Sequence, residues 1–134
     1  MLLKQIAEYA VREQTAKLPQ EVIHHAKRAV VDWYACLLPG SRTAPATLLE
    51  QALADELDHG RARLASGRRA PLRAAALING AASHTVEFDD IWRDAVYHPA
   101  SPVISAALAA AQAQGASGEA FLRDWVDQAA LGLG

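Results

Sequence analysis

The sequence is poor in several features that mark particular classes of protein. Its single cysteine, Cys36, allows no internal disulfide, so an oxidising compartment is not implied. Aromatic residues make up only 6% of the chain, and 13 Lys and Arg face 15 Asp and Glu. Nucleic-acid binders usually carry a basic excess, because phosphate neutralisation dominates their affinity. We therefore expect no nucleic-acid partner, and we interpret Cys36 as a small buried hydrophobe.

Long apolar runs and nucleotide-binding motifs are also missing. No run approaches the length that a membrane span needs. Near the N-terminus, charged residues such as Lys4, Glu8 and Arg12 interrupt the apolar ones and break any signal-peptide core. Neither GxxxxGK[ST] nor a GxGxxG that follows a strand occurs. These absences predict a cytoplasmic protein without membrane association or a nucleotide cofactor.

What the chain does contain is alanine at helical spacing. The composition is 51% hydrophobic and 21% charged, an ordinary globular balance, and 134 residues suit one domain over 1–134. Strand alternation is absent, apart from a brief extended piece at 63–65. The pattern predicts an all-α fold, with helices at residues 3–16, 20–38, 45–57, 71–82, 102–114 and 119–131.

Acids, histidines and aromatics concentrate in residues 84–101, between two alanine-rich helices. His84 and Glu87 are three apart, so on a helix or its last turn they would face the same way. His98 returns after a short loop. Imidazole and carboxylate groups held between packed helices are the groups that an enzyme needs, at minimum, to remove a proton from carbon and return it. The segment is therefore the candidate site.

Other interpretations of this segment stay open. Asp89 and Asp90 are also typical of a solvated loop or a helix cap, and His84 of a hydrogen-bonded core residue. A metal-dependent hydrolase using His84, Asp89 and His98 is a further alternative, since all three side chains are competent ligands. The spacing matches neither HExxH nor a paired CxxC motif, and we expect no metal.

An ordered series of motifs resembles the MmgE/PrpD family, which includes 2-methylcitrate dehydratases, cis-aconitate decarboxylases and iminodisuccinate epimerases. Residues 74–84 (AAALINGAASH) look like the family's alanine-rich helix that ends in Asn-Gly and a histidine. Residues 87–90 (EFDD) and 98–103 (HPASPV) resemble its acidic stretch and its His-Pro-Ser turn. Residues 18–32 and 115–118 fit as well, so the resemblance spans nearly the whole chain.

The resemblance implies a large helical domain and a smaller α/β lid in a homodimer. It also implies acid–base chemistry on a small polycarboxylate, without a metal, an iron–sulfur cluster or a nucleotide. By position, Glu87 and His98 would be the catalytic residues, although Glu87 replaces the aspartate of many members. The residues that would bind the substrate or support the pocket are His84, Asp89, Asp90, Arg93 and Ser101.

Family enzymes are far longer than this chain, and their lid supplies further substrate-binding groups. We therefore expect an N-terminal helical part, truncated or split, that is inactive alone and needs a complementing lid fragment. Ile91 also stands where a small hydroxyl residue is common. The rival from another class is a non-catalytic helical interaction module that uses the apolar face around Phe121 and Trp125 for dimerisation.

Overall fold

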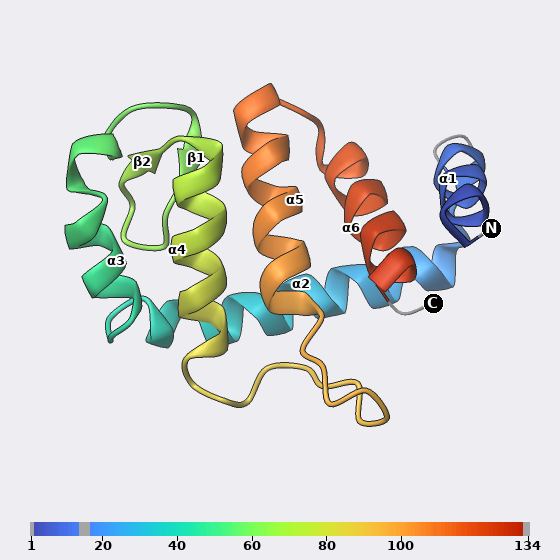
Figure 1. The fold of residues 1–134 in the computed structure, drawn as a ribbon, viewed down its shortest axis with the longest axis horizontal. Helices are drawn as coiled ribbons and strands as arrows, with labels where there is room; N and C mark the ends of the chain where they lie inside the picture. The colour runs from blue at the N-terminus through green and yellow to red at the C-terminus, as the bar shows by residue number, and fades with distance from the viewer. Residues whose placement is uncertain (1, 14–16, 133–134) are drawn as a thin grey trace.

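The computed structural model describes residues 2–13 and 17–132, and it is mostly helical (Figure 1). The helical fold class is confirmed. No helix in these two ranges is long and apolar enough to cross a membrane. The elements are α1 (Leu2–Glu13), α2 (Gln20–Gly40), α3 (Ala46–Ala52), the 3₁₀ helix η1 (Ala54–Glu56), β1 (Ala62–Arg63), β2 (Arg69–Ala70), α4 (Leu72–His84), α5 (Ala100–Gln114) and α6 (Gly118–Gly132).

The long helix α2 runs across one side of α4, α5 and α6 and forms the base of the core (Figure 1). Trp33 and Leu37 of α2 are buried in the same hydrophobic core as Ile78 of α4 and Ile104 of α5. The alanines of α4 and α5 allow those two helices to pack closely, because small side chains keep little distance between the backbones. This pairing sets the position of the segment that joins them.

The contact between α2 and α4 depends on Gly40. A Cβ atom at that position would collide with the carbonyl oxygen of Ala82, two residues before the end of α4. The sequence predicts that this helix ends at residue 38, before the Pro39–Gly40 pair, but α2 continues through both. The glycine therefore lets the last turn of α2 lie directly against the end of α4 that carries the candidate site.

A small antiparallel hairpin lies where the sequence predicts only a brief extended piece. Ala62 of β1 pairs with Ala70 of β2. Asn79 of α4 holds the hairpin, because its side chain donates to the carbonyl of Arg63 (2.8 Å) and accepts from the backbone nitrogen of Ala65 (3.2 Å). Strands of two residues are too short to show period-two alternation, so the pattern could not reveal them.

Two observations concern the helices at the ends of the chain. Helix α1 covers most of the predicted range 3–16, and residues 14–16 lie outside the described residues. Trp125 of α6 is buried, and its indole nitrogen donates to the carbonyl of Ala26 in α2 (3.4 Å). Trp125 itself, at the centre of the expected interaction face, is therefore packed within the chain, because α6 lies against both α2 and α5, whereas Phe121 stays half-buried.

Candidate active site

The site lies at one end of the α4–α5 pair, where the segment 85–99 leaves α4 and returns to α5 (Figure 1). Two backbone hydrogen bonds between Trp92 and Tyr97, of 2.7 and 3.2 Å, fold this segment back on itself. His84 is the last residue of α4, and Ser101 is in the first turn of α5. The fold-back therefore brings His98 next to His84.

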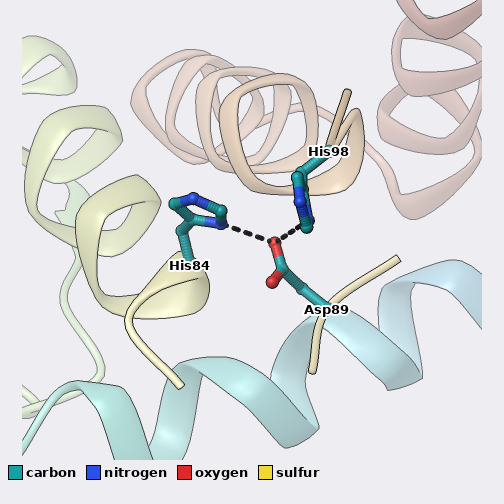
Figure 2. Close-up of side chains that lie close together, drawn as sticks. All are labelled: His84, Asp89 and His98. Atoms are coloured by element: carbon teal, nitrogen blue, oxygen red, sulfur yellow. Dashed lines mark hydrogen bonds and ion pairs between the residues drawn. The ribbon is translucent and has the colours of Figure 1, made fainter. Parts of the chain in front are cut away.

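The carboxylate of Asp89 lies between the two imidazoles (Figure 2). Its Oδ2 atom is 3.0 Å from Nδ1 of His84 and 3.3 Å from Nδ1 of His98. The same oxygen accepts a hydrogen bond from the hydroxyl of Ser101 (2.9 Å). The ring centres of the two histidines are 4.7 Å apart. One buried carboxylate oxygen thus joins α4, the loop and α5.

The pKa values of the two neighbouring aspartates, Asp89 and Asp90, shift in opposite directions. Burial raises the pKa of Asp89, but hydrogen bonds from His84 and Ser101 outweigh it and hold the pKa below its usual value. Burial also raises the pKa of Asp90, and the nearby Asp89 and Asp32 carboxylates add to the rise. At neutral pH, Asp89 is therefore ionised, and Asp90 holds its proton more tightly than a free aspartate does.

Two polar atoms in this cluster are buried without an aligned hydrogen bond: Oδ1 of Asp89 and Nδ1 of His98. Such atoms are uncommon and point to catalysis, an ordered water or an ion. One ligand atom from each of His84, Asp89 and His98 lies within 4.8 Å of the others, which is close enough to hold a metal ion. The cluster can serve acid–base chemistry or metal binding.

A pocket of about 760 Å³ opens beside the cluster. This volume is suited to a small molecule. Apolar residues of α4, α5 and the loop form most of its wall, and none of the described residues in the wall is Lys or Arg. The polar groups that line it are His84, Thr85, Tyr97, His98 and Ser101.

The predicted site residues occupy different places. His84, His98 and Ser101 line the pocket, and Asp89 connects all three behind it. Glu87 is exposed and does not line the pocket, and its Oε1 atom is 3.9 Å from Nε2 of His84. The expectation that Glu87 and His98 form one cavity wall thus differs from the geometry, because the carboxylate between the imidazoles belongs to Asp89.

The remaining two predicted residues lie away from the pocket wall. Arg93 is exposed in the folded-back loop. Asp90 is half-buried, and its Oδ1 atom accepts the backbone N–H of Ala100 at the start of α5 (3.1 Å). Asp90 therefore caps a helix, which is one of the alternatives that the sequence left open.

Two polar residues of the site that precede a histidine were missed from the sequence, and so was Thr85, which follows one. Tyr97 lines the pocket, and the hydroxyl of Ser83 contacts that of Ser101 at 3.1 Å. A signal was present for both, since each directly precedes a candidate histidine. A serine or tyrosine at such a position is nevertheless equally compatible with a helix surface or a loop, so the spacing alone did not single them out.

A helical domain that holds an imidazole–carboxylate cluster beside a pocket is equipped for acid–base chemistry on a small molecule. The family model described as the MmgE/PrpD N-terminal domain matches residues 4–127, and the chain therefore belongs to the MmgE/PrpD family.

Curated relatives have lyase names. The chain is 30% identical over 111 residues to the cis-aconitate decarboxylase-like protein oryM of Aspergillus oryzae, covering 82% of this chain and 23% of that protein. It is 30% identical over 109 residues to cis-aconitate decarboxylase of Aspergillus terreus, covering 81% of this chain and 22% of that enzyme. The chain thus spans less than a quarter of the length of these relatives. No solved structure matches it significantly.

Proposed function

We propose that this chain is the helical part of a cofactor-independent lyase that acts on a small polycarboxylate by acid–base chemistry. The observation that carries the proposal is the contact of two imidazoles with one buried carboxylate at a pocket wall, seen at His84, Asp89 and His98. The names of the relatives favour decarboxylation of a cis-aconitate-like substrate. Dehydration and epimerisation use the same proton transfers and are the alternatives within the class.

The chemistry assigns an acid and a base. In decarboxylation, the bond from carbon to a carboxylate breaks and carbon dioxide leaves. The electron pair of that bond forms a new double bond, and the pair of the old double bond takes a proton at its far carbon. We assign that proton to the imidazolium of His98, whose ring lines the pocket. Glu87, whose side chain is exposed, takes up a proton from water and returns it to the site after each turnover. In a dehydration, Glu87 would instead remove the proton next to a carboxylate.

A polycarboxylate also needs cationic or donor groups to hold it. The described pocket wall provides imidazoles and hydroxyls but no Lys or Arg. We therefore propose that residues outside this chain complete the substrate site, from a lid segment or from the second subunit of a homodimer. On this proposal the chain alone binds a polycarboxylate weakly and does not turn it over, and the complete enzyme works in the cytoplasm.

A chimera tests the proposal. The matched segment of the Aspergillus terreus enzyme is replaced by this chain, and release of carbon dioxide from cis-aconitate is measured. We expect activity that falls at least about 100-fold in E87Q and in H98N. The exposed loop carboxylate of Asp94 provides the matched control, and D94N should leave the rate unchanged. An active chimera that tolerates both E87Q and H98N contradicts the proposal.

A second measurement uses the chain itself and does not depend on a folded chimera. Cis-aconitate and 2-methylcitrate are titrated into ¹⁵N-labelled protein, and butyrate serves as a monocarboxylate control. Shifts at His84 and His98 that saturate with the polycarboxylates and not with butyrate support the proposal. Absence of any shift at these residues up to tens of millimolar contradicts it.

The spacing of the same three residues favours one second candidate, a metal-dependent hydrolase. Two histidines and a carboxylate that leave other coordination positions of the metal open are a known metal-binding set. Metal analysis of the purified chain separates the two functions. Near-stoichiometric zinc, manganese or iron that is lost in D89N would favour the hydrolase. A metal-free chain whose His84 and His98 signals shift with the polycarboxylates would favour the lyase.

A further inference from the structure

The imidazole of His84 lies between two carboxylates of different character. Its Nδ1 atom is 3.0 Å from Oδ2 of Asp89, whose side chain has no exposed surface. Its Nε2 atom is 3.9 Å from Oε1 of Glu87, whose side chain is 73% exposed. One ring nitrogen therefore faces the interior and the other faces the solvent side, where the proposed base lies.

Asp89 is held firmly on its inner side. Its Oδ2 atom accepts from the hydroxyl of Ser101, and that hydroxyl is in contact with Ser83 at 3.1 Å. Both serines are buried. The hydrogen bonds from His84 and Ser101 lower the pKa of Asp89 despite the opposing effect of burial, so the carboxylate is ionised at neutral pH.

An ionised carboxylate can only accept hydrogen bonds. The Nδ1 atom of His84 must therefore bear the hydrogen that points to Asp89. In the neutral ring, Nε2 is then left as an acceptor, and it faces Glu87. Such an arrangement, with a buried carboxylate fixing the tautomer of an imidazole that serves a third group, is the logic of catalytic triads.

We propose that His84 is a positioning residue of this site: Asp89 fixes it as the Nδ1–H tautomer, and its Nε2 exchanges a proton with Glu87. A proton that Glu87 takes up passes to Nε2, the ring becomes an imidazolium next to ionised Asp89, and Glu87 is a carboxylate again. The reverse transfer restores the neutral ring. The gap of 3.9 Å closes by rotation of the exposed Glu87 side chain or by one bridging water.

The neighbouring charged groups allow only one of the two imidazoles, His84 or His98, to carry a positive charge at a time. His98 packs edge-on against His84, with ring centres 4.7 Å apart, and its Nδ1 is 3.3 Å from the same oxygen of Asp89. Two imidazoliums at this distance would repel each other, and a single carboxylate would face both. Asp90 is the other acid next to Asp89, and its Oδ1 atom faces the backbone nitrogen of Ala100 rather than either imidazole.

The proposal rests on the proposed role of Glu87 in proton transfer, but its first test needs no catalysis. Long-range ¹H–¹⁵N spectra of histidine-labelled protein distinguish a ring nitrogen that carries hydrogen from one that does not. We expect neutral His84 to carry hydrogen on Nδ1. In D89A no acceptor faces Nδ1, so the hydrogen should no longer be held on that nitrogen. D94N, on the same loop, and E87Q should both leave the wild-type tautomer unchanged.

A wild-type His84 with hydrogen on Nε2 overturns the proposal, and this result does not depend on whether D89A folds. A folded D89A, checked by circular dichroism, that keeps hydrogen fixed on Nδ1 overturns it as well.

Kinetics of the active chimera separate this inference from the proposed function. H84Q should lower kcat at least about tenfold and move the acid limb of the pH–rate profile, whereas D94N should change neither. If E87Q and H98N abolish activity but H84Q leaves the profile unchanged, the role of His84 is wrong and the lyase proposal stands. If E87Q and H98N have no effect, the lyase proposal fails whatever the tautomer.

Discussion

The Oδ1 atom of Asp90 lies 3.1 Å from the backbone nitrogen of Ala100, the first residue of α5. The first N–H groups of a helix have no partner within the helix, and this side chain satisfies one of them from ten residues earlier. The same bond closes the loop that contains His98 and sets the start of α5, where Ser101 lies. Asp90 thus connects the stability of the helix to the geometry of the site.

Replacing Asp90 by asparagine should stabilise the chain at neutral pH. The amide oxygen of asparagine keeps the acceptor for Ala100 and removes a half-buried charge next to Asp89. Because folding raises the pKa of Asp90, its protonation stabilises the folded chain, and that contribution is lost as the pH rises from about 3.8 through the folded value.

Thermal unfolding at two pH values checks this prediction. D90N should melt at a higher temperature than the wild type at pH 7, and the difference should shrink below the ordinary aspartate pKa. D90A, which loses the acceptor, should cost about 1 kcal/mol relative to D90N. A D90N variant that is less stable than the wild type at pH 7 contradicts the predicted direction of the change in stability.

The buried hydrogen bond between Trp33 and Ser105 should be needed for full stability. The indole nitrogen of Trp33 donates to the hydroxyl of Ser105 at 3.1 Å, and both side chains are buried. S105A leaves the N–H without a partner, which costs about 1–3 kcal/mol of the free energy of unfolding. Urea unfolding measures the loss, with S66A at an exposed turn as the control. A loss below about 0.5 kcal/mol would argue against this bond.

Substitution of Gly40 should disturb the end of α4. The Cβ of G40A would meet the backbone of Ala82, which cannot rotate away as a side chain can. We expect a loss of about 1–3 kcal/mol, the usual cost of overpacking. G118A is the matched control, because no atom lies within 4 Å of a Cβ at that position. Equal stability of the two variants would show that α2 and α4 separate without cost.

The contact of Asn79 with the hairpin gives a further prediction. N79A would leave the carbonyl of Arg63 and the backbone nitrogen of Ala65 without their partners, at roughly 1–3 kcal/mol for each group that stays buried. Q112A removes an exposed acceptor for the backbone nitrogen of Arg63 on the same strand, where water can take over. Chemical denaturation should therefore show that N79A is much less stable than Q112A. The opposite order would count against the role of Asn79 in holding the hairpin.

Much of the fold could be predicted because helices leave a regular signal. The apolar spacing located α2, α4, α5 and α6 to within about two residues at each end. Where a helix boundary differs from the predicted one, the difference has a local cause. Helix α5 begins at Ala100 rather than at Pro102, because Asp90 caps the earlier residue and a proline is tolerated in a first helical turn.

The candidate site was less predictable, because its side chains leave an irregular loop. The sequence placed His84 and Glu87 on one face by assuming that the helix continues. Helix α4 ends at His84, and Glu87 has a left-handed backbone with φ of 57°. Three-residue spacing no longer fixes where a side chain lies once the backbone leaves the helical region, so the approach of Glu87 to His84 depends on the loop.

The sequence alone determined that this chain is helical, that its acids and imidazoles gather in residues 84–101, and that it resembles the MmgE/PrpD family. Only the tertiary structure decided that Asp89, rather than Glu87, lies between His84 and His98. Periodicity is a property of consecutive residues, whereas this contact depends on how two distant helices and a loop meet. Which carboxylate is buried therefore followed from packing.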